Sequence, residues 1–174
     1  MITTSLHWIK GPWPGRLAIS SRPRGGEWLD DEIRGWRQSK LDMIVSLLAA
    51  DEVTELELTQ EAELCRVHGL RFLSFPIVDR GVPLSRTATF DFAQKLHDAL
   101  VSGKNVLIHC RQGIGRAALI AACVLVLSGV DPENAFREIS SARGVSVPET
   151  PEQRKWVDEF ARTAAKSSYE IIKD

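Results

Sequence analysis

Residues 105–120 read Asn105-Val-Leu-Ile-His-Cys-Arg-Gln-Gly-Ile-Gly-Arg-Ala-Ala-Leu-Ile120. An apolar run leads to Cys110, a short stretch contains Gly113 and Gly115, and a second, longer apolar run follows Arg116. A short apolar run, a glycine-containing break and a longer apolar run indicate a buried strand, a tight loop and a helix. The stretch therefore predicts that Cys110 ends a strand and that Arg116 begins a helix.

A loop of this kind suits an oxyanion such as phosphate. Glycine freedom lets successive backbone N–H groups point inward, and the N-terminus of the following helix adds its positive end. The same field favours the thiolate form of Cys110, which is the nucleophilic form of a cysteine. Arg116 can hold two oxygens of one phosphate at once, with a geometry that lysine lacks. We therefore interpret the loop as a phosphate site that carries a nucleophile.

These residues also resemble a known family. His109-Cys110-x-x-Gly113-x-x-Arg116 resembles the HCxxGxxR signature loop of the protein tyrosine phosphatase superfamily, in particular its dual-specificity branch. Residues 143–153 are similar to the corresponding region of small dual-specificity phosphatases, including the kinase-associated type. The alternative to this interpretation is a buried strand that ends in an inert cysteine, followed by a tightly packed helix.

The resemblance implies roles for the residues of the loop. Cys110 would attack phosphorus, Arg116 would hold the phosphate oxygens, and His109 would orient the loop and favour the thiolate through hydrogen bonds. For His109 the other interpretation is a plain core histidine. The loop residues expected to bind phosphate are Arg111, Gln112, Gly113, Ile114, Gly115 and Arg116.

A second stretch, Ile77-Val-Asp-Arg-Gly-Val-Pro83, has the composition of a loop. Asp79 lies in it, 31 residues before Cys110. In the family, a loop about this far upstream carries the aspartic acid that protonates the leaving oxygen, so the resemblance implies that Asp79 is the general acid. Its alternative role is an Asx-turn with Gly81.

The resemblance implies hydrolysis of phosphotyrosine and phosphoserine/threonine in proteins through a phosphocysteine intermediate. Ala117 departs from the family, which usually places serine or threonine after the arginine to hydrogen-bond the cysteine sulfur. We expect this loss to slow breakdown of the phosphoenzyme. Glu149 also departs, because many tyrosine-specific members carry a water-positioning glutamine there.

Two other functions remain open at this point. Arg111 adds a basic residue directly after the cysteine, as in phosphoinositide phosphatases, so a phosphoinositide or inositol phosphate is the alternative substrate. Ala117 is compatible with a pseudo-phosphatase that binds phosphorylated partners without turnover. Retention of Cys110, Arg116 and Asp79 favours the enzyme.

Composition excludes several classes of protein. The chain has 174 residues, 44% of them apolar, and a net charge of −1 with both signs interspersed, which predicts one domain and no nucleic-acid or membrane-surface footprint. The longest apolar run, residues 117–127, is too short to span a bilayer, and the N-terminus lacks the pattern of a secretory signal. We therefore expect a soluble, cytoplasmic protein with a phosphorylated protein as its partner.

The three cysteines and four histidines give no metal or disulfide pattern. An odd number of cysteines offers no disulfide framework, and Cys65 and Cys123 fall inside predicted helices, where they are expected to be core residues. The histidines lack metal-ligand spacing. We therefore predict no metal, and the inferred chemistry needs no cofactor.

The remaining pattern predicts an α/β fold with a central, mostly parallel twisted sheet flanked by helices. The expected strands are residues 41–48, 70–75 and 105–108, and the expected helices are residues 27–38, 59–68, 85–102, 115–127, 132–142 and one that starts near 151. We predict a single domain over 1–174, with an irregular lead-in at 1–15, an edge strand at 16–20 and a frayed tail at 164–174. Trp28, Trp36 and Val67 are expected to face the core.

Overall fold

The computed structural model describes residues 4–171 and shows a single α/β domain. Its sheet has five strands in the order β1-β2-β5-β3-β4. Only β1 is antiparallel to its neighbour, and the other pairs are parallel. The strands are β1 (His7–Ile9), β2 (Leu17–Ser20), β3 (Met43–Ser46), β4 (Arg71–Ser74) and β5 (Val106–His109).

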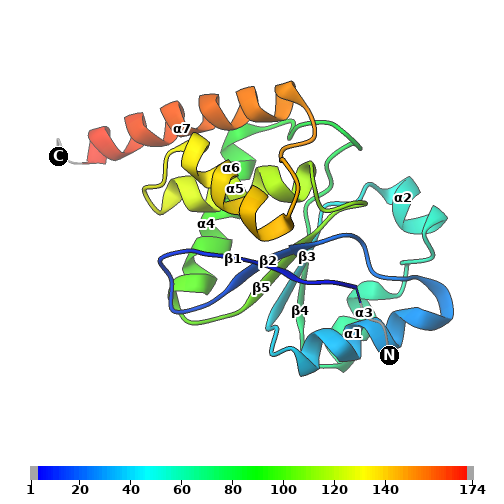
Figure 1. Cartoon of the computed structure of the whole chain (residues 1–174). Coiled ribbons are helices and arrows are strands. Elements are labelled where there is room, and N and C mark those ends of the chain that lie inside the picture. The colour runs from blue at the N-terminus through cyan, green and yellow to red at the C-terminus, as the bar shows by residue number, and fades with distance from the viewer. Residues whose placement is uncertain (1–3, 172–174) are drawn as a thin grey trace.

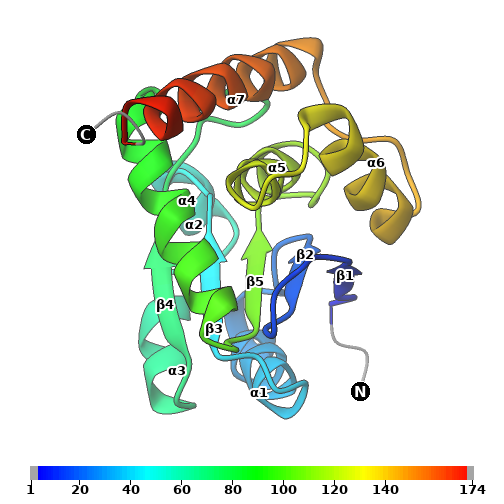
Figure 2. The same cartoon turned by 90° about the vertical axis from the view of Figure 1, so that its left-hand side faces the viewer.

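Helices cover both faces of the sheet, as Figure 2 shows. The chain continues from the 3-10 turn η1 (Gly26–Trp28) into α1 (Leu29–Gln38), and the later helices are α2 (Ala50–Glu55), α3 (Glu61–Val67), α4 (Arg86–Val101), α5 (Arg116–Leu127), α6 (Pro132–Arg143) and α7 (Pro151–Ile171). Strands β2, β3 and β5 are buried along their whole length. Burial on both faces explains why these strands read as continuous apolar runs.

Alternate residues of the central strands feed two separate cores. Ala18, Ile44 and Leu107 point to one face, where they pack with residues of α1 and α3. Their neighbours along the strands point to the other face, where they pack with α4, α5, α6 and α7. Helix α5 is buried over nearly its whole length, because it is apolar all round. A helix held this firmly gives the loop before it a rigid support.

The strand register determines where the loop after β5 lies. Ser20 and Ser46, the last residues of β2 and β3, both pair with His109, the last residue of β5. Three parallel strands therefore end side by side, and the loop at residues 110–115 lies at their shared carboxyl edge. In open parallel sheets, ligands bind at this edge.

The predicted helices and strands are present, and three of the helices begin with a side-chain cap. Ser85 caps α4, Asp131 caps α6, and Thr150 accepts a hydrogen bond from the backbone N–H of Gln153 at the start of α7. These caps satisfy backbone N–H groups that a helix cannot pair internally. The helix boundaries could therefore be predicted from local sequence.

Two expectations near the N-terminus are wrong. Residues 16–20 do not form an edge strand, because β1 covers the outer side of β2, and β1 lies inside the expected irregular lead-in. The expected frayed tail is helical as far as Ile171, and its fraying stays a prediction. Residues 1–3 and 172–174, which belong to the predicted lead-in and the predicted tail, lie outside the described residues.

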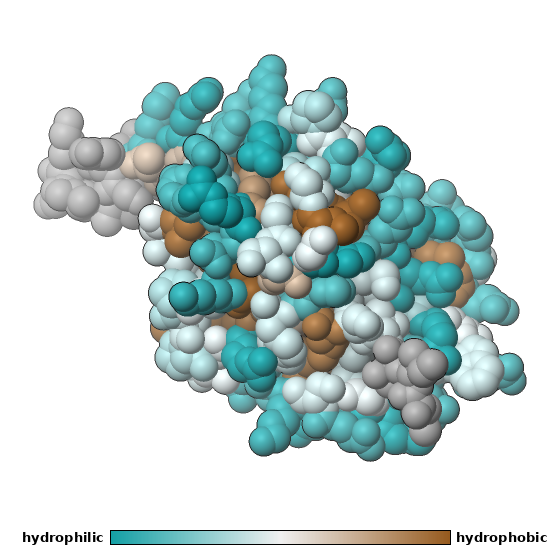
Figure 3. Space-filling model, viewed as in Figure 1, coloured by the Kyte–Doolittle hydropathy of each residue, from teal (hydrophilic) through white to brown (hydrophobic). Residues whose placement is uncertain are grey.

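Two helix faces also differ from the prediction. The Trp28 side chain is 50% exposed, whereas Trp36 is buried as expected. In α3, Val67 is exposed and the buried positions are Glu61 and Cys65. Glu61 thus places a carboxylate at a core-facing position, where it contacts His109 at the end of β5. On the face shown in Figure 3, hydrophilic residues dominate and the apolar patches are small and separate.

Candidate active site

The loop between β5 and α5 wraps around the sulfur of Cys110. The backbone N–H of Gly113 donates a hydrogen bond to the Cys110 sulfur at 3.3 Å, and Cys110 is only 3% exposed. Gly113 has φ +71°, and a Cβ there would lie 2.5 Å from the backbone carbonyl of Ser20. Only glycine satisfies both conditions. The loop therefore passes so close to the end of β2 that position 113 has no room for a side chain.

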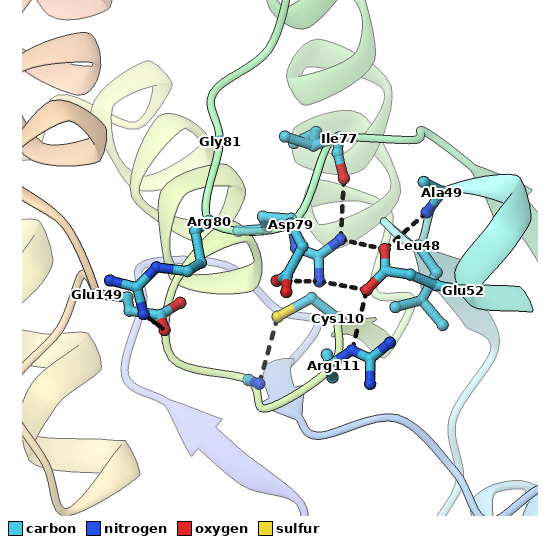
Figure 4. A network of polar contacts seen from close by, with 12 residues as sticks. Leu48, Ala49, Glu52, Ile77, Asp79, Arg80, Gly81, Cys110, Arg111 and Glu149 are labelled. Atoms are coloured by element: carbon cyan, nitrogen blue, oxygen red, sulfur yellow. Dashed lines mark hydrogen bonds and ion pairs between the residues drawn. The ribbon is translucent and has the colours of Figure 1, made fainter. Parts of the chain in front are cut away.

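A cavity of about 130 Å³ opens over this sulfur. Its walls come from the loop after β4, the loop after β5, the start of α5 and the segment before α7, as Figure 4 shows in part. The lining residues are Asp79, Arg80, Cys110, Arg111, Gln112, Gly115, Arg116 and Glu149. The structure thus places the predicted nucleophile, arginine and acid around one space.

Arg116 is buried and held by a carboxylate from a distant helix. Its two terminal nitrogens donate to Glu52 at 2.6 and 2.9 Å, and one of them also donates to the Ile77 carbonyl at 2.9 Å. Burial alone would raise the pKa of Glu52, but the hydrogen bonds from Arg116, the Ala49 N–H and Arg111, together with the positive charge of Arg116, outweigh it and lower the pKa to about 2. Burial alone would likewise lower the pKa of Arg116, yet its hydrogen bonds to Glu52 and its electrostatic interactions with Cys110, Glu52 and Asp79 together raise it. The pair is therefore fully ionised, and the guanidinium is fixed beside the sulfur.

Asp79 binds the same guanidinium, through a nitrogen that also donates to Glu52. Its Oδ1 accepts a hydrogen bond from Arg116 at 2.8 Å, and its side chain is 50% exposed. Asp79 and Arg116 are far apart in the sequence, but they follow β4 and β5. These two strands both flank β3 in parallel, so their carboxyl ends lie at the same edge of the sheet. The predicted acid is thus brought to the cavity that the predicted nucleophile, Cys110, also lines.

His109 lies beneath the loop, outside the cavity. It is fully buried, its Nε2 lies 2.7 Å from Glu61 Oε1, and the ring centroid of Trp36 is 5.9 Å away. Its Nδ1 is buried without a hydrogen-bond partner. This placement suits a residue that orients the loop from below and does not suit direct contact with a substrate.

The other predicted phosphate-binding residues fall into two groups. Arg111, Gln112 and Gly115 line the cavity, whereas Ile114 packs its side chain against the core. The guanidinium of Arg111 binds Glu52 at 3.2 Å and Glu55 at 3.1 Å. Its charge is therefore matched by carboxylates of α2 within the protein.

Sequence reasoning missed Glu52 and Glu61, which hold Arg116 and His109. Both lie far from their partners in the sequence, and nothing in the local pattern marks them. Glu52 also accepts a hydrogen bond from the Ala49 N–H at the start of α2. Its local sequence therefore indicates only an acidic residue in the first turn of a helix. Their roles depend on which strands are neighbours.

The remaining cysteines stay separate from this site. Burial raises the pKa of Cys65 and of Cys123, as expected for inert core thiols. Across residues 4–171, no three histidine, cysteine or acidic side chains gather in a way that could hold a metal ion. None of the helices in that part of the chain combines the length and apolar character needed to cross a bilayer.

Comparison with known proteins identifies the same architecture. A family model described as "Swiss Army Knife protein, DSP-PTPase phosphatase domain" (PTP-SAK) matches residues 3–169. Rat cyclin-dependent kinase inhibitor 3 is 27% identical over 111 residues, which cover 63% of this chain and 52% of that protein. A putative tyrosine phosphatase of Invertebrate iridescent virus 3 is 33% identical over 94 residues, or 50% of this chain and 39% of that protein. The chain thus spans about half the length, or less, of these relatives.

Solved structures share the fold over nearly the whole chain. Kinase-associated phosphatase (KAP), in a form with its catalytic-site cysteine changed to serine, aligns with a TM-score of 0.85 at 20% identity over 95% of this chain and 98% of its own. Tk-PTP aligns with a TM-score of 0.72 at 27% identity over 91% and 97%. With the family model spanning almost every residue, the chain belongs to the dual-specificity branch of the cysteine-dependent protein tyrosine phosphatases.

Proposed function

We propose that this protein hydrolyses phosphomonoesters of proteins, on phosphotyrosine and on phosphoserine or phosphothreonine, through a phosphocysteine intermediate. The observation that carries the proposal is the meeting of Cys110, Arg116 and Asp79 at one small cavity at the carboxyl edge of the sheet. A nucleophile, an oxyanion clamp and an acid are the groups that this two-step reaction requires.

In the first step, the Cys110 thiolate attacks phosphorus and the ester P–O bond breaks. Arg116 and the loop N–H groups hold the equatorial oxygens, and protonated Asp79 gives its proton to the leaving oxygen. Arg116 must then exchange its hydrogen bond to Asp79 for bonds to the phosphate. That exchange frees Asp79 to face the leaving group.

In the second step, water attacks the phosphocysteine, the P–S bond breaks, and inorganic phosphate and the thiolate are released. Asp79, now ionised, accepts the proton of the attacking water. Ala117 is fully buried at the start of α5 and offers no hydroxyl to the departing sulfur. The second step is therefore the slower one in this proposal.

The charges around the cavity favour a phosphoprotein over a polyphosphorylated lipid. Arg116 is balanced by Glu52 and Asp79, and Arg111 is already paired with Glu52 and Glu55. Additional phosphates would therefore meet carboxylates and few free cations. PTPMT1, whose structure has been solved in complex with PI(5)P, shares the fold at 19% identity, so phosphoinositides belong in the test panel.

The test is hydrolysis of 4-nitrophenyl phosphate by the wild type, Cys110→Ser and Asp79→Ala. We expect Cys110→Ser to abolish turnover and Asp79→Ala to reduce it, because a positioned acid contributes about 10² to 10⁴ in rate. Phosphopeptides should be better substrates than phosphoinositides. Activity that survives in Cys110→Ser would contradict the mechanism, and absence of turnover in the wild type would identify a phosphate-binding pseudo-phosphatase.

A further inference from the structure

The loop that carries Asp79 is also attached on the side away from Arg116. The residue after the acid, Arg80, donates to Glu149 Oε1 at 2.9 Å, across 69 positions of sequence. Arg80 has φ +59°, a left-handed conformation that is uncommon for a residue with a side chain. Its guanidinium is nevertheless directed to one partner, at the edge of the cavity (Figure 4).

A second contact lies next to the first. Gln153 is fully buried, and its Nε2 donates to the Gly81 carbonyl at 3.1 Å, while its Oε1 accepts from the Thr150 N–H. Glu149 and Gln153 therefore hold two consecutive residues of the acid loop. Both come from the segment that starts α7, a helix packed against α5.

The same two side chains lie close to Gly115 of the phosphate loop and leave no room for a side chain there. A Cβ built on Gly115 would lie 2.8 Å from Glu149 Oε2 and 3.0 Å from Gln153 Nε2. Glu149 and Gln153 thus stand between Gly115 on one side and Arg80 and Gly81 on the other. They form a bridge that links the loop of the nucleophile to the loop of the acid.

We infer that Arg80, Glu149 and Gln153 are positioning residues that keep Asp79 over the phosphate loop while substrate is bound. The inference rests on the proposed function. Asp79 has a direct bond to Arg116, but the substrate phosphate must take that guanidinium over. Asp79 thus loses its hydrogen bond to Arg116 in the same step in which it has to protonate the leaving group. The contacts through Arg80 and Gly81 do not involve Arg116, so they persist when phosphate binds.

A role in positioning the acid affects substrates with different leaving groups unequally, whereas a purely structural role does not. A general acid matters most when the leaving oxygen is a poor leaving group, because a good leaving group departs without full protonation. Removing the contacts that position Asp79 should therefore slow the hydrolysis of phenyl phosphate more than that of 4-nitrophenyl phosphate. A general loss of folded protein or of phosphate binding would slow both substrates equally.

The experiment measures kcat/KM on both substrates for Arg80→Gln, Glu149→Gln, the double variant and Arg80→Lys. We expect each single variant to lower the activity on phenyl phosphate by about two- to fivefold, with a smaller loss on 4-nitrophenyl phosphate, as suits an exposed ion pair. The double variant should be no worse than the single ones, because both remove the same contact. Arg80→Lys should restore much of the activity.

The matched control is the ion pair between Arg86 of α4 and Glu159 of α7, which is similarly exposed and does not line the cavity. Arg86→Gln and Glu159→Gln should leave the ratio of the two substrates unchanged. Equal losses on both substrates, additive losses, or no loss in the Arg80 and Glu149 variants would overturn the inference.

Asp79→Asn, measured in parallel, separates this inference from the proposed function. If Asp79→Asn does not change the substrate ratio, Asp79 is not the acid, and the proposed function and the inference fail together. If Asp79→Asn changes the ratio and the Arg80 and Glu149 variants do not, only the inference fails.

Discussion

Two loops meet at this site, and they are held in different ways. The loop after β5 is enclosed by the end of β2, by α5 and by its own hydrogen bond to the Cys110 sulfur. The loop after β4 is more exposed at Val78, Asp79, Arg80 and Leu84, and its attachments to the site come from side chains of other elements. The nucleophile is thus placed by the backbone of the fold, whereas the acid is placed by side-chain contacts.

This difference matches the tasks that the proposed mechanism gives to the two loops. The phosphate site must present its N–H groups at defined positions, and a rigid backbone does this without reorganisation during the reaction. The acid must release Arg116 to the substrate and still reach the leaving oxygen. A loop with few buried apolar contacts opens at low free-energy cost, so it can make that exchange.

The largest loss of activity should come from Gly113→Ala, which distorts the backbone of the loop after β5. A Cβ would meet the Ser20 backbone, and φ +71° is strained for alanine. We expect kcat/KM on 4-nitrophenyl phosphate to fall roughly 10³-fold, because several oxyanion donors are displaced together and one alone is worth about 10² to 10³. The assay uses purified variants at equal concentration of folded protein.

Gly129→Ala is the control for this change. Gly129 also has a positive φ, +88°, but nothing lies within 4 Å of the added Cβ. Both variants should lose about 1 kcal/mol of stability from the positive φ, Gly113→Ala should lose more because its Cβ also meets the Ser20 backbone, and only Gly113→Ala should lose activity per folded protein. Similar activity in the two variants would mean that the loop is not fixed by its backbone.

The next effect concerns Glu52, which holds Arg116 between the two loops. Its pKa is about 2 in the folded protein against an ordinary value of 4.5, so its stabilising contribution is complete above pH 4.5 and disappears as the pH falls through 2. The difference corresponds to roughly 3 kcal/mol. The stability gap between the wild type and Glu52→Gln, measured by urea unfolding, should therefore narrow by about this amount on acidification. Glu55→Gln, at an exposed carboxylate, should show no comparable narrowing, and a constant gap for Glu52→Gln would contradict the prediction.

The smallest effect should come from Ala117→Ser, which adds a hydroxyl at the start of α5. A hydrogen bond to the departing sulfur should speed hydrolysis of the phosphocysteine by roughly ten- to a hundredfold, since bonds to charged groups contribute about 1.5 to 3 kcal/mol. Rapid-quench kinetics should trap the intermediate in the wild type and less of it in the variant.

Ala118→Ser places the same hydroxyl one position further along the same buried helix and should not accelerate this step. The interpretation of Ala117 is wrong if its serine variant has unchanged turnover and no intermediate accumulates in either protein.

Sequence reasoning worked best where the interaction is local. The strand, loop and helix around Cys110 are specified within 16 residues, and the caps of α4, α6 and α7 lie within four positions of the groups they satisfy. It failed for Trp28 and Val67, since apolar character alone does not say which face of a helix meets the sheet. It also failed for residues 16–20, because strand order is not written in any local pattern.

The sequence by itself determined the α/β class and the strand, loop and helix around Cys110, because hydrophobic period and glycine placement are properties of short segments. Cys110 and Arg116 were candidates from that loop, and Asp79 was a candidate through the family resemblance. Only the tertiary structure decided how those residues are held. Glu52 and Glu61 reach Arg116 and His109 across 64 and 48 positions, and Glu149 reaches Arg80 across 69. Such contacts depend on the order in which parallel strands assemble, since that order brings their carboxyl ends, and the loops that follow them, to one edge.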